Sequence, residues 1–67
     1  MMDRYKAVGT ETIEVGNDNL KITVMIQPKQ VWYRIRDGRD DKFLLERYNV
    51  VIDIDKERFE KLFVYDY

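Results

Sequence analysis

The chain contains no histidine, no cysteine and no serine among its 67 residues. These absences remove the commonest general base, the two commonest nucleophiles, all disulfide bonds and the usual ligands of a structural zinc ion. The side chains left for chemistry are threonine, lysine, tyrosine and carboxylates. The sequence therefore predicts a protein that is not an enzyme and that carries no cofactor.

Glycine and long apolar runs are also scarce. The three glycines, Gly9, Gly16 and Gly38, are too scattered to form a phosphate-binding loop. No apolar run approaches the roughly 20 residues that a membrane helix needs, and the N-terminal segment lacks the apolar region of a secretory signal. A chain without cysteine suits a reducing compartment. We therefore expect a cytoplasmic protein that does not enter a membrane.

The charges nearly cancel, because 12 basic residues face 13 acidic ones and the net charge is −1. A field this weak does not favour adhesion to nucleic acid or to an anionic membrane. Hydrophobic residues make up 45% of the chain, which is too apolar for a disordered segment. Residues 1–67 are expected to form a single small domain of marginal stability, since so short a chain buries little surface.

Alternating apolar and polar side chains predict strands in the first half of the chain. The expected strands are 11–15, 20–27 and 31–36. Asparagine, aspartate and glycine at 16–19 favour a hairpin between the first two, because these residues tolerate a left-handed backbone. The Asp37-Gly38 pair predicts a second hairpin after the third strand.

The second half of the chain is more ambiguous. Residues 43–47 have side chains that helices favour, yet they follow a hairpin turn, and we interpret them as a strand. Alternation resumes over 48–54 with the opposite parity, which predicts a bulge near 46–48. Asp55 can then cap a helix over 56–63, whose apolar stripe would cover the sheet. The predicted fold class is α+β, with about four antiparallel strands in two hairpins and one C-terminal helix packed on one face.

The third predicted strand carries the strongest candidates for binding. Trp32, Arg34 and Arg36, called here the tryptophan–arginine stripe, lie on the face opposite Val31, Tyr33 and Ile35. Tryptophan and arginine are enriched at binding hot spots. Two interpretations are open. Trp32 lies in the core beneath the helix while the arginines pair with carboxylates such as Glu46, or the whole stripe is exposed and recognises a partner.

The C-terminal residues Tyr65 and Tyr67 are further binding candidates, which either pack back on the sheet or contact a partner. The leading functional hypothesis is a non-enzymatic module that binds a larger protein as its regulator or inhibitor. Size and balanced charge resemble those of small regulators in general, including the ones that phages and mobile elements carry. A homodimer is also expected, through the edge of a strand such as 20–26.

Two alternative functions are weaker. The stripe could stack on single-stranded nucleic acid, but the adjacent carboxylates of Asp37, Asp40 and Asp41 would repel a phosphate backbone. Asp53 and Asp55 could hold a divalent cation for a metal-dependent hydrolase. For Asp55, however, capping of the helix is the favoured interpretation.

Overall fold

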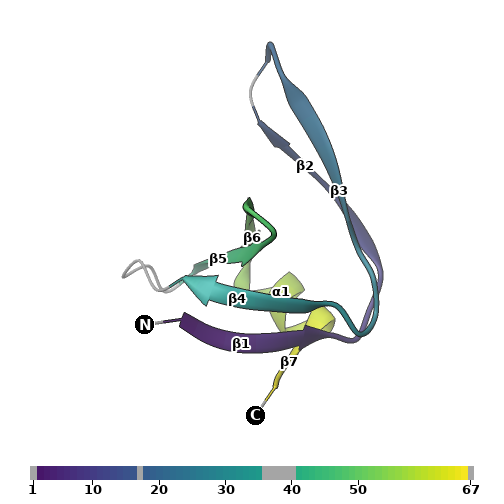
Figure 1. Ribbon diagram of the computed structural model, residues 1–67, viewed down its shortest axis with the longest axis vertical. Helices are drawn as coiled ribbons and strands as arrows, with labels where there is room; N and C mark the ends of the chain where they lie inside the picture. The colour runs from purple at the N-terminus through teal and green to yellow at the C-terminus, as the bar shows by residue number, and fades with distance from the viewer. Residues whose placement is uncertain (1, 17, 36–40, 67) are drawn as a thin grey trace.

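The computed structural model describes residues 2–16, 18–35 and 41–66, with seven strands and one helix. In chain order they are β1 (Met2–Ala7), β2 (Glu11–Gly16), β3 (Lys21–Ile26), β4 (Val31–Ile35), β5 (Lys42–Arg47), β6 (Val50–Asp55), α1 (Lys56–Leu62) and β7 (Phe63–Tyr65). A five-stranded sheet has the order β6-β5-β4-β1-β7, while β2 and β3 form a separate two-stranded sheet that extends away from it (Figure 1).

The predicted fold class is confirmed in its coarse form, with antiparallel strands and one C-terminal helix, but the prediction of about four strands is wrong. The strands of both predicted hairpins pair as expected, β2 with β3 and β4 with β5, while the Asp37-Gly38 turn lies outside the described residues. The missed strands are β1 and β7, which lie side by side. β1 alternates charged residues with a tyrosine and an alanine, so its strand character comes from the pairing with β4 and β7 rather than from an apolar pattern.

The predicted bulge near residues 46–48 is also wrong, because the chain reverses direction there. Tyr48 and Asn49 have φ angles of 51° and 65°, which form a two-residue turn between β5 and β6. The reversal explains the change of parity, since Leu45 pairs with Ile52 and both side chains are buried. Asparagine tolerates a positive φ angle, whereas tyrosine rarely adopts one. Only one of the two turn residues therefore belongs to the residue types that usually mark such a turn.

The helix begins where the sequence predicts. The Asp55 side chain accepts a hydrogen bond from the backbone N–H of Arg58 at 2.8 Å, which satisfies one of the free donors at the helix start. Phe59 and Leu62 are buried, and Phe63 follows them into the core as the first residue of β7. A helix of seven residues is unstable alone, so this stripe holds it against the sheet.

Replacing Asp55 by alanine is expected to lower the free energy of unfolding by about 1 kcal/mol, because the cap hydrogen bond is lost. Urea denaturation followed by far-UV circular dichroism measures the change. Asp53→Ala is the matched control, since Asp53 is an exposed carboxylate two residues earlier on β6, 3.9 Å from Lys42. An exposed pair of this kind contributes little, so the control should change stability by less than about 0.5 kcal/mol. Equal losses for both variants would contradict the capping role.

The two faces of the five-stranded sheet differ in what covers them. Trp32 in β4 is 1% exposed, whereas its neighbour Tyr33 is 41% exposed. The helix therefore lies over the face that carries Trp32, which we call the core face. The buried residues on this face are Ala7, Trp32, Phe43, Leu45, Ile52, Ile54 and Phe63.

Candidate functional site

The opposite side of the sheet, which we call the open face, has no buried residue among those described. Alternation along the strands places the following side chains on it, and every one is exposed or half-buried: Arg4, Lys6, Val31, Tyr33, Ile35, Lys42, Leu44, Glu46, Val51, Asp53 and Val64. Antiparallel sheets commonly pack one face on the core and leave the other to solvent. An open face is therefore ordinary, but its composition is informative.

The centre of the open face is apolar. Ile35 of β4 lies opposite Leu44 of β5, and Tyr33 is the neighbouring residue of β4 on the same face. Val51, which is 42% exposed, extends this surface onto β6. Tyrosine combines a large contact area with a hydroxyl group and is one of the residue types that anchor protein interfaces. The open face therefore has the apolar centre that a protein-binding surface needs.

Charged side chains lie on both sides of this apolar centre. Arg4 of β1 pairs with Tyr33 on one side, and Glu46 of β5 pairs with Tyr33 on the other. Lys6 adds a second basic residue on β1, and Asp53 adds a second acidic residue on β6. Two of these charges are balanced by a neighbour, since Arg4 contacts Asp66 at 3.2 Å and Asp53 lies 3.9 Å from Lys42. Lys6 beside β1 and Glu46 on β5 are the charges that differ between the two sides.

Trp32 and Arg34, the described residues of the tryptophan–arginine stripe, do not lie on the open face. The indole of Trp32 packs edge-on against Phe63, with ring centroids 6.3 Å apart, and its Nε1 donates a hydrogen bond to Gln30 Oε1 at 3.1 Å. The interpretation of Trp32 as an exposed anchor is therefore wrong, and its place in the core is confirmed. The predicted pairing of the arginines with Glu46 is not seen for Arg34, because Glu46 lies opposite Tyr33 on the other face of the sheet. A large aromatic ring with a local partner for its N–H is stable inside the core, whereas the smaller apolar residues of β4 tolerate partial exposure.

Arg34 is also turned toward the core face. Its guanidinium lies 3.7 Å from the centre of the Phe43 ring, and its Nε is buried without a hydrogen-bond partner in the described part of the chain. This geometry favours a cation–π contact that covers Phe43 rather than a side chain extended toward a ligand. Arg36 lies outside the described residues. The alternative of base stacking on this stripe thus lacks the aromatic ring on which it relied.

Tyr65, the C-terminal tyrosine that the structure describes, does not lie on the open face either. Tyr65 lies on β7 opposite Tyr5, and the two rings meet edge-on with centroids 5.4 Å apart. The ring remains 52% exposed at the edge of the sheet. Tyr67 lies outside the described residues. β7 with Tyr65 thus packs back on the sheet, which was one of the two expected arrangements.

The carboxylates proposed for metal binding have structural contacts instead. Asp55 caps the helix, and Asp53 lies 3.9 Å from the ammonium group of Lys42. Within residues 2–16, 18–35 and 41–66, no three acidic side chains come together in a way that could hold a metal ion. The hydrolase alternative has no cluster in this part of the chain to support it.

The sequence pattern does not predict the shape of the β2–β3 hairpin, which we call the arm. Figure 1 shows it extending beyond the five-stranded sheet. Ile26 at the base is fully buried, whereas Ile22 is 51% and Leu20 is 67% exposed. Alternation predicts a half-buried strand over its whole length. Ile13 is buried and Val15 and Val24 pack against the core, but the arm's outer side chains Leu20 and Ile22 stay exposed. No sequence signal distinguishes the covered half from the uncovered half.

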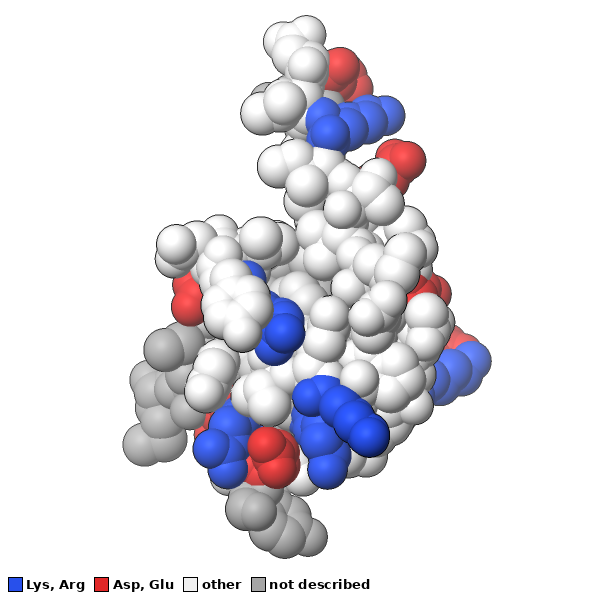
Figure 2. Space-filling model, turned by 45° about the vertical axis from the view of Figure 1, so that its right-hand side comes forward, with Lys and Arg blue, Asp and Glu red and all other residues white. Residues whose placement is uncertain are grey.

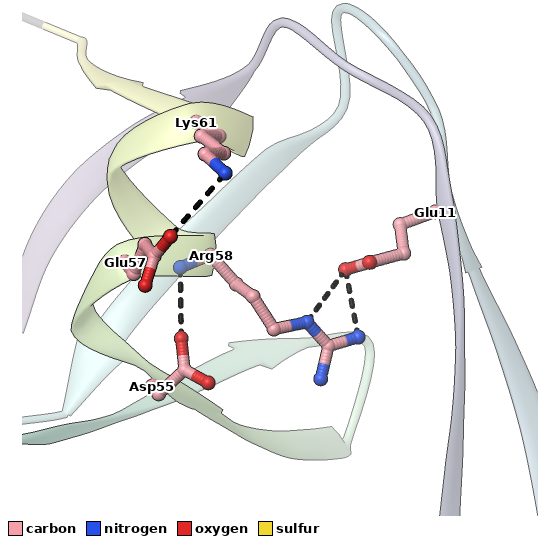
Figure 3. Close-up of polar contacts among 5 residues, drawn as sticks. All are labelled: Glu11, Asp55, Glu57, Arg58 and Lys61. Atoms are coloured by element: carbon pink, nitrogen blue, oxygen red, sulfur yellow. Dashed lines mark hydrogen bonds and ion pairs between the residues drawn. The ribbon is translucent and has the colours of Figure 1, made fainter.

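The base of the arm is tied to the helix and to β4. The guanidinium of Arg58 contacts Glu11 Oε2 through Nη2 at 2.8 Å and through Nε at 3.1 Å (Figure 3). Gln30 Oε1 accepts hydrogen bonds from the Gln27 backbone N–H and from Trp32 Nε1. Ion pairs this exposed contribute little to stability, but together with buried Ile26 they fix where the arm leaves the domain.

A pocket of about 150 Å³ lies where the arm meets the five-stranded sheet. Val24 and Met25 line it from β3, Trp32 lines it from β4, and Tyr48 and Val50 line it from the β5–β6 turn and β6. Gln30 and Arg47 also line the pocket. Figure 2 shows that the surface between the arm and the body is mostly uncharged, with basic side-chain atoms beside it. A cavity of about this volume in an apolar core accommodates benzene, so the pocket has room for one apolar side chain.

No protein-family model, curated protein or solved structure matches this chain. In the part of the chain that the structure describes, no helix combines the length and the apolar character that crossing a membrane requires.

Proposed function

We propose that the protein is a non-enzymatic binding module that regulates or inhibits a larger cytoplasmic protein. Its binding surface is the open face. The observation that supports this proposal is the apolar centre around Tyr33, Ile35, Leu44 and Val51, on a sheet face where no described residue is buried. Exposed apolar patches with a polar rim mark protein interaction sites.

The charges on the open face indicate what kind of partner fits. Lys6 favours an acidic side chain beside β1 and Glu46 favours a basic side chain beside β5. Arg4 and Asp53 already have partners of opposite charge in Asp66 and Lys42. Complementary charges mainly raise the rate of association and select the orientation. The affinity comes from the apolar centre, where the ring of Tyr33 offers the largest area.

Replacing Tyr33 by lysine tests this surface. We expect binding of the partner to weaken by at least about 30-fold, which corresponds to about 2 kcal/mol for a hot-spot residue. Tyr33 is 41% exposed on the open face, so the variant should keep its circular dichroism spectrum. Wild-type and variant proteins are compared by capture of partners from the native cells, followed by calorimetry with the purified partner.

Tyr48→Lys is the matched control, because Tyr48 is 83% exposed but belongs to the β5–β6 turn and not to the open face. The control should bind the partner like the wild type. A Tyr33→Lys variant that binds with unchanged affinity would show that the open face is not the binding surface. Binding of single-stranded oligonucleotides that weakens steeply with added salt would instead support the nucleic-acid alternative.

A further inference from the structure

The arm has two features that the proposed function does not use. Its outer half exposes the apolar side chains of Ile22 and Leu20, and the strands β2 and β3 pair only with each other in the described sheets. A strand edge without a neighbour presents backbone N–H and C=O groups that can pair with another chain. The arm is therefore a candidate for strand pairing.

The free edge of β3 is better suited to pairing with a copy of itself than the free edge of β2. β2 carries Glu11 and Glu14 and no basic residue, so two copies of it would bring like charges together. β3 carries a single charge, Lys21, followed by the β-branched residues Ile22, Thr23 and Val24. β3 also borders the pocket, which Val24 and Met25 line.

We propose that the protein forms a dimer in which the β3 strands of two copies pair antiparallel, with the two-fold axis through Thr23. In this register Ile22 of each copy lies opposite Val24 of the other, and Lys21 lies opposite Met25. No like charges face each other, and two threonines meet at the axis, which is a favourable cross-strand pair. Ile22 of each copy then enters the pocket beside Val24 of the other copy.

A second copy is the occupant that the structure supports, because the same chain carries both complementary parts. Ile22 is half exposed on one side of Thr23, and Val24 at the pocket wall lies at the same distance on the other side. A two-fold axis through Thr23 therefore satisfies both pockets at once, as an isologous interface requires. The pairing also joins two arms into a four-stranded ribbon. The added strand pairing and buried surface would stabilise a chain of 67 residues that has no disulfide bond.

The absence of native cysteine allows a direct test by cross-linking. In Thr23→Cys the new thiols face each other across the axis, where directly opposed residues have Cα atoms about 4.5–5.5 Å apart, within the range that a disulfide spans. We expect mild oxidation to convert this variant into a covalent dimer. Glu14→Cys is the matched control, because Glu14 pairs with Thr23 in the arm but lies on β2. The control should remain uncross-linked.

Sedimentation equilibrium completes the test without an introduced thiol. The wild-type protein should have the mass of two chains, and Ile22→Lys should have the mass of one chain with an unchanged circular dichroism spectrum, since Ile22 is 51% exposed. A wild-type protein that remains monomeric, an Ile22→Lys variant that remains dimeric, or cross-linking of Glu14→Cys as readily as Thr23→Cys would each overturn the proposal. A different protein that pairs with β3 of a monomeric wild type would do the same.

Discussion

Trp32→Ala is expected to lose about 3–5 kcal/mol of unfolding free energy, the usual cost of removing a large aromatic side chain from a core. The Trp32 ring is 1% exposed and packs against Phe63, and its loss also leaves Gln30 Oε1 without one of its donors. A domain this small has only about 3–5 kcal/mol of stability from its core. The variant should therefore be largely unfolded at room temperature.

Far-UV circular dichroism during urea denaturation measures this loss. Tyr33→Ala is the natural control, because Tyr33 is the next residue on the same strand and points to the open face. It should lose less than about 1 kcal/mol, since it leaves no buried cavity. A Trp32→Ala variant that stays folded with near wild-type stability would contradict the placement of Trp32 in the core. It would also restore the indole as a candidate binding residue.

Strand alternation predicted much of the sheet, because the pattern of period two depends on residues that are near in sequence. The strands over 11–15 and 31–36 lie within one residue of β2 and β4, and 20–27 overlaps β3. β1 alternates too, but it lacks a run of apolar residues on its inner face. Its outward residues Arg4 and Lys6 are charged and its strand character comes from two neighbours distant in sequence, so local information is insufficient.

The candidate binding surface was harder to predict than the fold, since it depends on which face of β4 is buried. Both faces of this strand carry apolar side chains, and the pattern alone does not rank Trp32 against Tyr33. The choice is made by tertiary partners, because the helix and β7 cover the side with Trp32 and Phe43. The position of the helix therefore decides which face of the sheet is open, and the sequence of β4 alone does not.

Partner binding and self-association are assigned to different strands, which makes them separable. Tyr33 belongs to β4, whereas Ile22 belongs to the arm. A lysine at position 33 should weaken partner binding by at least about 30-fold and leave the dimer intact. A lysine at position 22 should dissociate the dimer without altering the open face. The two proposals therefore stand or fail independently.

Phe59→Ala is expected to cost about 3–5 kcal/mol as well, but the loss should begin at the helix. The Phe59 ring is 7% exposed and lies between three aromatic rings, with centroid distances of 4.8 Å to Tyr5, 4.5 Å to Phe43 and 5.5 Å to Phe63. A helix of seven residues has no stability of its own, so it depends on this contact. The Arg58–Glu11 contact at the arm would be lost with it.

Hydrogen exchange, measured in a stabilising osmolyte so that the variant stays folded, distinguishes it from a uniform loss of stability. In Phe59→Ala the amides of residues 59–62 should exchange faster than those of β4 and β5, because the helix detaches before the sheet opens. Glu60→Ala is the control, since Glu60 is exposed on the same helix and should change stability by less than about 0.5 kcal/mol. Equal acceleration at the helix and at β4 would mean that helix and sheet unfold as one unit. The open face would then depend on the helix for its existence and not only for the choice of its side.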